Sequence, residues 1–478
     1  MVCPSSMWVV GSIVGLCLLG PLAAQEQPAH TGRRPNILLV VSDDHAAHAM
    51  SCYQSRLDET PCLDRLAKAG MRFDRAFVSN ALCGPSRACI LTGKYGHSNG
   101  FMQNEQVFDG AQWTVSKALQ AGGYQTAAIG KWHLGSDPTG FDYWRILPGQ
   151  GRYIDPVFVT RDGRKVEKGY VSDLITDAAI EWLGQRDAAK PFFLFVGHKA
   201  PHREWTPPPD LAAVYRKRTF PESPTLFDDW ATRCSAGPDS EMSVARHLTE
   251  TDVKGKPPAD LQGTALTRWY YQRYLQDYLA CAQSMDRNVG RLLDWLDQHG
   301  LAADTLVVYT SDNGFFLGDH GMYDKRFMYE ESLRVPLLVR WPGVVAAGSM
   351  TDAMVGNHDL APTFLRAAGL EVPASLHGRE LGPVLRGKTP ADWRQVFYYR
   401  YYEHLATHHV PAHFGVRTMT HKLIWFPSLS AFELFDLRSD PHELKNLAGD
   451  PAHAALLAEL TAELCRQQAQ LGDPEPLR

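Results

Sequence analysis

Cys83 opens a short segment whose residue types and spacing could support nucleophilic chemistry on an anion. Residues 83–87 read Cys-Gly-Pro-Ser-Arg, and apolar residues then lead to Gly93. Pro85 suits the first turn of a helix because it has no N–H to leave unpaired, and glycine suits a left-handed helix end. A cysteine beside such a start faces free backbone N–H groups and the positive end of the helix dipole. Arg87 adds paired donors for a tetrahedral oxyanion, so the segment predicts a reactive position; the simpler alternative is a buried cysteine before an ordinary capped helix.

Two pairs of oxygen-bearing side chains follow two predicted strands. Asp43 and Asp44 follow an apolar run, and so do Asp312 and Asn313. Ligands collect at the carboxyl ends of strands in open α/β sheets, where adjacent carboxylates are costly unless a cation neutralises them. Either pair alone could be a solvated turn or a helix cap. Together they predict a site for a hard divalent cation, with Ca²⁺ favoured over Mg²⁺.

Cations and histidines follow two further strands. Lys131 and His133 stand between two glycines, and the string from His198 to His202 follows another apolar run. Lysine can hold an anionic substrate, and histidine can exchange protons near neutral pH. Lys325 follows the second oxygen pair, although an isolated lysine is ordinarily solvated surface. Cysteines or glutamates at zinc-ligand spacing do not accompany the histidines, which argues against a zinc site.

Apolar runs and helical patterns alternate along the chain and predict the fold. Continuous apolar runs are typical of strands buried on both faces of a parallel sheet. The expected strands are residues 36–41, 126–129, 192–196, 305–309 and 335–339, and the expected helices are residues 114–121, 172–185 and 266–299. This alternation predicts an α/β sandwich with a mostly parallel central sheet. Residues 200–258 are rich in proline and charge and are expected to form a long surface insertion.

The pattern changes near residue 390. Short strand patterns at residues 396–402, 412–416, 422–426 and 432–437 lack long helices between them, and a helical pattern covers residues 452–470. We therefore expect a catalytic domain over residues 33–390. Residues 391–478 are expected to form an α+β subdomain, in which one helix covers a small antiparallel sheet.

Composition and the N-terminal segment limit the possible functions. The chain has 478 residues, 44% hydrophobic residues and a net charge of −5, so it can build a large core and lacks the charge typical of nucleic-acid binding. The mostly apolar residues 8–22 and the small residues before Gln25 predict a signal peptide over residues 1–24 and export to the periplasm or the medium. That run is too short for a comfortable membrane span, and no stable span is expected elsewhere. The cysteines outside the signal peptide and position 83 could form disulfides or simply be buried.

Taken in order, these segments resemble the type I sulfatase family from residue 34 to about residue 447. The Cys83 run matches the family's maturation signature, with Gly84 a less usual residue at a variable position. The other matching segments are residues 36–44, 130–135, 198–202, 311–314, 318–336, 433–437, 440–441 and 446–447. The resemblance implies an alkaline-phosphatase-like α/β/α fold and hydrolysis of sulfate monoesters.

The resemblance also implies a role for each candidate residue. In the family, a formylglycine-generating enzyme oxidises the cysteine to formylglycine, whose hydrate attacks sulfur. The residues that look like calcium ligands are Asp43, Asp44, Asp312, Asn313 and the modified Cys83. The residues that look like the sulfate pocket are Arg87, Lys131, His133, His202 and Lys325. Lys325 or His202 would protonate the leaving alcohol, His133 would deprotonate the remaining hydroxyl so that the aldehyde reforms, and His198 would be structural.

Several segments, at residues 92–95, 140–144 with 147–151, 224–229 and 325–331, are similar to N-acetylglucosamine-6-sulfatases of glycan-degrading bacteria. The expected substrate is therefore a 6-O-sulfated N-acetylglucosamine unit of a glycan. Trp144 and Trp205, expected in loops, could stack on sugar rings or could serve only in packing. Two alternatives stay open: a phosphomonoester or phosphonate hydrolase on the same scaffold, and a glycan-binding protein in which Cys83 is never converted.

Overall fold

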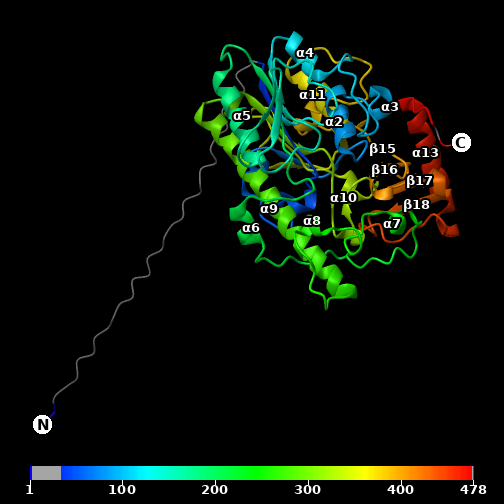
Figure 1. The fold of residues 1–478 in the computed structure, drawn as a ribbon. Helices are drawn as coiled ribbons and strands as arrows, with labels where there is room; N and C mark the ends of the chain where they lie inside the picture. The colour runs from blue at the N-terminus through cyan, green and yellow to red at the C-terminus, as the bar shows by residue number, and fades with distance from the viewer. Residues whose placement is uncertain (3–33, 476, 478) are drawn as a thin grey trace.

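The computed structural model describes residues 1–2, 34–475 and 477 (Figure 1). Apart from its first two residues, the predicted signal peptide lies outside the described residues. In the part of the chain that is described, no helix is long and apolar enough to cross a membrane. The cysteines of that part are all free: Cys52, Cys62, Cys83, Cys89, Cys234, Cys281 and Cys465.

A ten-stranded mixed sheet lies at the centre of the fold, in the order β13-β2-β12-β9-β1-β8-β4-β5-β6-β7. In that order the strands span Ser349–Thr351, Met71–Phe73, Leu337–Arg340, Thr305–Ser311, Asn36–Ser42, Phe192–Gly197, Gln125–Lys131, Tyr143–Leu147, Val157–Thr160 and Gly163–Val166. The strands from β9 to β5 are parallel to one another. The predicted α/β class with a mostly parallel sheet is confirmed.

The strand expected at residues 335–339 enters this sheet in the opposite direction from its neighbour. β12 runs antiparallel to β9, with Leu338 opposite Tyr309. The chain between these strands contains the β10–β11 ribbon (Phe316–Leu317 and Tyr323–Asp324) and the short helix α10 (Glu330–Leu333), and no long crossover helix. A parallel return requires such a crossover, so an apolar run alone could not reveal the direction of β12.

Helices cover both faces of the sheet. Alternate residues of each central strand point to opposite sides, and because the residues on both sides are apolar, both faces are buried under helices. On β1, Leu38 and Val40 belong to one hydrophobic core, and Leu39 and Val41 belong to the other. The first core includes residues of α1 (Pro61–Lys68), α5 (Val171–Gln185), α6 (Pro209–Tyr215) and α9 (Gly263–Gln298); the second includes residues of α2 (Cys83–Thr92), α4 (Val115–Ala121) and α11 (Leu360–Ala367) (Figure 1). The result is the predicted α/β/α sandwich.

A four-stranded antiparallel sheet follows in the C-terminal part of the chain. Its strands are β15 (Val396–Tyr401), β16 (His413–Thr418), β17 (His421–Phe426) and β18 (Ala431–Asp436), and α13 (Ala454–Leu471) lies against it. One face, with Tyr398, packs in a core shared with α13, whereas the other face, with Tyr399, joins a core of the central sandwich. The antiparallel sheet with its helix is as predicted, and the domain boundary at residue 390 stays a prediction.

The remaining elements are short. They are β3 (Ala76–Phe77), β14 (Val355–Gly356), α3 (Gly96–Asn99), α7 (Ala236–Asp239), α8 (Glu250–Val253) and α12 (Gly382–Leu385).

The expectation of a surface insertion at residues 200–258 is wrong for much of that segment. Met242 and Val244 are buried, and the backbone N–H of Cys234 donates to Glu433 of β18 at 2.9 Å. The charged residues that suggested solvent exposure are largely paired within the fold, as between Arg203 and Asp252. Charge content indicated a surface because sequence alone does not show which charges find partners.

The expectation that Trp144 lies in a loop is wrong, and although Trp205 does lie in a loop, neither tryptophan is exposed to stack on a sugar. Trp144 lies within β5 and is 6% exposed, and Trp205 is fully buried. The ring of Trp205 packs against Tyr274 of α9, with 4.7 Å between ring centres. Both tryptophans therefore serve packing, the alternative that the sequence left open.

Candidate active site

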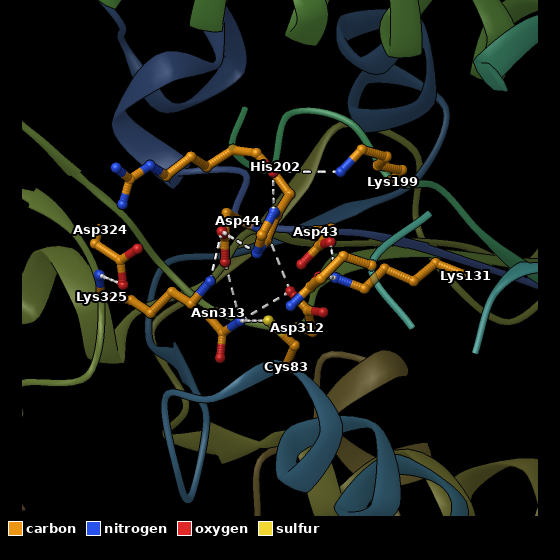
Figure 2. Close-up of polar contacts among 12 residues, drawn as sticks. Asp43, Asp44, Cys83, Lys131, Lys199, His202, Asp312, Asn313, Asp324 and Lys325 are labelled. Atoms are coloured by element: carbon orange, nitrogen blue, oxygen red, sulfur yellow. Dashed lines mark hydrogen bonds and ion pairs between the residues drawn. The ribbon is translucent and has the colours of Figure 1, made fainter. Parts of the chain in front are cut away.

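Strand ends and one helix start meet at the site (Figure 2). β1 ends immediately before Asp43, β9 ends immediately before Asp312, and β4 ends at Lys131. Because these strands belong to the four consecutive parallel strands β9-β1-β8-β4, their carboxyl ends share one edge of the sheet. α2 begins at Cys83 and faces this edge, so the helix start and the strand ends enclose one polar centre.

Cys83 is the first residue of α2, and Gly93 caps the helix with φ 65°, as the sequence predicted. The side chain of Cys83 is buried, and Asn313 Nδ2 lies 3.7 Å from its sulfur. Burial raises the pKa of the Cys83 thiol well above its ordinary value, although Lys131 opposes the shift. The unmodified residue is therefore a neutral thiol and a poor nucleophile at neutral pH.

Gly84, the less usual residue in this run, is required by close packing. A Cβ atom at this position would lie 2.9 Å from the carbonyl oxygen of His133 and 2.7 Å from the ring of Phe101. The Gly84 N–H donates a hydrogen bond to Asn104 Oδ1 at 3.0 Å, which holds the start of α2 against the loop that contains Asn104. The glycine thus allows α2 to approach the segment that carries His133.

Asp43, Asp44 and Asp312 form a buried cluster whose nearest carboxylate oxygens all lie within 4.8 Å of one another. Burial raises the pKa of Asp44 to about 8, and burial together with the charge of Asp43 raises that of Asp312 to about 6. Burial would also raise the pKa of Asp43, but the electrostatic interactions with His202 and Lys131 hold it well below its ordinary value. Asp43 Oδ1 and Asn313 Oδ1 are buried without a hydrogen-bond partner among the described residues. Three close carboxylates and unpartnered oxygens are the donor set that a hard divalent cation requires.

Two lysines enter this cluster from opposite sides (Figure 2). Lys131 is fully buried and pairs with Asp43 Oδ2. Lys325 is 2% exposed, and its Nζ lies 2.6 Å from Asp44 Oδ2. Burial would lower the pKa of Lys325, but Asp44 more than reverses the shift and holds it well above the ordinary value. The ordinary expectation of a solvated surface lysine is therefore wrong for Lys325.

Arg87 connects the helix to the strand ends. Its Nε donates to Asp312 Oδ2 at 2.8 Å, and its Nη1 donates to the carbonyl of Lys131 at 2.8 Å. The remaining nitrogen, Nη2, is buried without a hydrogen-bond partner among the described residues. Arg87 thus orients two other site residues and keeps one donor available for an anion.

The histidines occupy different positions. The Nε2 atom of His202 lies 3.7 Å from Asp44 Oδ2, and its Nδ1 contacts the carbonyl of Arg203. His133 has φ 59°, and its buried Nδ1 has no partner in the described part of the protein. Burial lowers the pKa of both rings well below the ordinary value, although Asp43 opposes the shift in each. His198 is fully buried and makes no side-chain hydrogen bond with described residues, which fits the structural role expected for it.

The structure adds contacts that sequence reasoning did not single out. Gln150, in the loop after β5, accepts a hydrogen bond from Lys131 Nζ, and Asn104 accepts one from Gly84. Gln150 belongs to a segment noted for its resemblance to N-acetylglucosamine-6-sulfatases, so a signal existed for it, whereas Asn104 had none. Lys199 and Tyr153 contact the backbone around His202.

Two family models match this chain. One, described as Sulfatase, covers residues 35–370, and another, described as N-sulphoglucosamine sulphohydrolase, C-terminal, covers residues 318–470. The chain belongs to the sulfatase family. The predicted family is thereby confirmed, and with it the predicted enzyme class, a hydrolase of sulfate esters.

Individual relatives of this sulfatase are similar over nearly its whole length. The N-acetylglucosamine-6-O-sulfatase of Bacteroides thetaiotaomicron is 45% identical over 490 aligned residues, which cover 93% of this chain and 88% of the relative. A solved structure of a protein in complex with its substrate, D-glucosamine-2-N,6-O-disulfate, has a TM-score of 0.90 and 45% identity, and covers 93% of this chain and 99% of that chain. The phosphonate monoester hydrolase of Agrobacterium radiobacter has a TM-score of 0.75 at 23% identity, covering 92% of this chain and 96% of that chain, and shares the fold alone.

Proposed function

We propose that this sulfatase hydrolyses 6-O-sulfate esters of N-acetylglucosamine or N-sulfoglucosamine units, using formylglycine at position 83 and a bound Ca²⁺. The observation that carries the proposal is the convergence on Cys83 of three buried carboxylates and three buried cations. Such a concentration of buried charge is costly in a site that serves only stability, and it is suited to binding and cleaving an anionic ester. The identity of the substrate is supported by the relatives described above.

The residues present fit the cation. Asp43, Asp44 and Asp312 would hold Ca²⁺ together with Asn313, whose amide would turn its unpartnered oxygen toward the ion. When bound, Ca²⁺ would neutralise the carboxylates and polarise the oxygens of the nucleophile and the sulfate. A cation in this position would also explain why buried carboxylates persist where burial raises the pKa of Asp44 to about 8.

The proposed chemistry at residue 83 requires its conversion, because the thiol is neutral and buried. Formylglycine in its hydrated form would supply two hydroxyls on one carbon, one to attack sulfur and one to allow expulsion of sulfate when the aldehyde reforms. The chain's other residues then act on charge and protons. Arg87, Lys131 and Lys325 would hold the sulfate oxygens and stabilise charge in the transition state.

Proton transfer falls to the remaining candidates. Lys325 or His202 would donate a proton to the leaving C6 oxygen, and His133 would accept one from the second hydroxyl. His133 suits a base, since burial holds its pKa low and its buried Nδ1 has no partner among the described residues. Both candidates lie beside Asp44 (Figure 2). Lys325 carries its proton, because Asp44 holds its pKa well above the ordinary value, whereas His202 would donate only after its Nε2 has taken up a proton.

Desulfation of defined sugars tests this proposal. Sulfate release would be measured for N-acetylglucosamine carrying sulfate at C6, at C3 or at C4 and for galactose 6-sulfate, and phosphate release would be measured for N-acetylglucosamine 6-phosphate. We expect the 6-sulfate of N-acetylglucosamine to be hydrolysed fastest. Faster hydrolysis of the phosphate would favour the phosphohydrolase alternative. A peptide mass showing an unmodified Cys83 in protein made with a formylglycine-generating enzyme would favour the glycan-binding alternative.

The proposal extends to maturation and location. The segment at residues 83–87 has the sequence that a formylglycine-generating enzyme modifies in the family, so that enzyme is the proposed maturation partner. We also propose that the predicted signal peptide at residues 1–24 directs export to the periplasm or the medium, where the enzyme would encounter sulfated glycans. N-terminal sequencing of the exported protein tests this, and a mature chain that begins near Gln25 is the expected result.

A further inference from the structure

The turn after β8 determines how His202 meets the substrate pocket, and we propose that Lys199 and Tyr153 are positioning residues for His202. The inference rests on the proposed function, in which His202 is a candidate donor of the proton to the leaving oxygen. Neither Lys199 nor Tyr153 needs to touch the substrate for this role. Both contact the backbone that fixes the His202 ring.

Lys199 is a buried cation that has no carboxylate partner among the described residues. Lys199 is 3% exposed, and its Nζ donates a hydrogen bond to the carbonyl of Arg203 at 3.3 Å. The same Nζ lies 4.8 Å from the ring centre of Tyr153, in a cation–π arrangement. Burial lowers the pKa of Lys199 to about 8, and Lys131 adds to the shift. An ammonium kept in such a place without an ion-pair partner is a cost to stability, which points to a task in the site.

Tyr153 holds the other carbonyl of the same turn. Its hydroxyl donates to the carbonyl of His202 at 2.6 Å, and the N–H of His202 closes the turn on the carbonyl of Lys199 at 2.9 Å. Tyr153 comes from the loop after β5, which also brings Gln150 to Lys131. One loop therefore contacts both a sulfate-pocket lysine and the turn that carries His202.

These contacts fix the chemistry of the imidazole. The carbonyl of Arg203 accepts from Lys199 and also contacts His202 Nδ1 (Figure 2). A carbonyl can only accept, so Nδ1 must carry its proton. The other nitrogen, Nε2, then faces Asp44 and the substrate pocket as the atom that can exchange a proton. Loss of Lys199 or Tyr153 would free the turn and let the ring leave this orientation.

A double-mutant cycle separates positioning from an independent role. Lys199→Met and Tyr153→Phe would each be assayed alone and in a His202→Ala background, on N-acetylglucosamine 6-sulfate, with conversion of Cys83 measured by peptide mass in every variant. We expect each single substitution to lower kcat by about 10- to 100-fold, since a misplaced catalytic group commonly costs that much, and to change KM by less than about 2-fold. In the His202→Ala background the same substitutions should lower kcat by no more than about 2-fold.

Tyr170→Phe is the matched control, because Tyr170 stacks on Tyr153 at 5.9 Å between ring centres without bonding to the His202 turn. Its kcat should stay within about 2-fold of the unmodified sequence. If Lys199→Met lowered kcat in the His202→Ala background by as large a factor as it does alone, or lowered kcat in neither background, the inference would be overturned. Absence of turnover by the parent protein would instead refute the proposed function. A crystal structure of the Tyr153→Phe/Lys199→Met variant needs no substrate, and an unchanged His202 ring there would also overturn the inference.

Discussion

Substitution of Gly84 by alanine tests the packing that places His133 beside the nucleophile. The added Cβ would meet the His133 carbonyl oxygen at 2.9 Å, the Phe101 ring at 2.7 Å and Asn104 Oδ1 at 3.0 Å. Ordinary Cβ contacts begin near 3.4 Å, so a backbone oxygen must move by several tenths of an ångström. The Phe101 ring could turn aside, but the His133 carbonyl is part of the backbone and carries the catalytic candidate with it.

The expected size of the effect follows from these contacts. Overpacking of a tight site by one methyl group costs about 1–3 kcal/mol of the free energy of unfolding. A shift of about 1 Å in a catalytic group can cost about 100-fold in rate, so a shift of about half that distance in His133 should lower kcat by about 10-fold. We expect KM to change less, because the three atoms nearest to the added methyl group belong to Phe101, His133 and Asn104 rather than to the sulfate-pocket cations.

Urea unfolding and steady-state kinetics on N-acetylglucosamine 6-sulfate measure both effects, with Cys83 conversion determined for each sample. Gly184→Ala is the matched control: Gly184 lies within α5, and a Cβ there meets nothing within 4 Å. Replacing an exposed helical glycine by alanine should raise the free energy of unfolding by about 0.5–1 kcal/mol and leave kcat unchanged. If Gly84→Ala were as stable and as active as the parent protein, the close approach of α2 to His133 would be refuted.

Three further outcomes are expected. Cys83→Ala and Cys83→Ser should both abolish turnover while the thermal midpoint stays within a few degrees of the parent value; full activity of either would remove residue 83 as the nucleophile. Exhaustive chelation should abolish sulfate release and lower the thermal midpoint, and added Ca²⁺ should restore both, whereas activity that survives metal removal would refute the cation site. Burial lowers the pKa of His320, but the hydrogen bond to Asp228 and the nearby Glu331 carboxylate more than reverse this and raise it to about 9 from 6.5. A raised pKa contributes stability that is present below pH 6.5 and lost as pH rises through 9, so the free energy of unfolding should fall over that window by an amount on the order of 3 kcal/mol. His320→Gln should flatten this dependence of the free energy of unfolding on pH. Equal slopes against pH for the two proteins, measured by urea unfolding, would contradict the role of His320.

The central fold could be predicted because its strands are apolar without interruption. The runs beginning at Asn36, Phe192 and Thr305 all became parallel neighbours, since a strand buried on both faces leaves an unmistakable pattern. The outer strands β6 and β7 carry mixed or exposed residues, and β2 has only three residues, so no such pattern marks them. The direction of β12 depends on its connection rather than on its own residues.

The site residues could be named because each follows a strand end or begins a helix. Asp43, Lys131 and Asp312 are identified by the strands that precede them. Lys325 follows only the two-residue strand β11, which no apolar run marks in the sequence, so only the family resemblance pointed to it. Tyr153 and Lys199 could not have been assigned at all, because their contacts are with backbone carbonyls, which every sequence possesses.

The ion pairs of the cluster lead to a last inference about how cation and substrate depend on each other. The formal charges of Asp43, Asp44 and Asp312 are matched by those of the three buried cations, and each cation pairs directly with one carboxylate: Arg87 with Asp312, Lys131 with Asp43 and Lys325 with Asp44. A divalent ion bound by the carboxylates would take over that neutralisation and leave the lysine charges for the sulfate ester. The cation would thus turn a nearly neutral cluster into one with an excess of positive charge, which an anionic ester completes. By linkage, sulfate or a sulfated sugar must then strengthen Ca²⁺ binding by the same factor by which Ca²⁺ strengthens theirs.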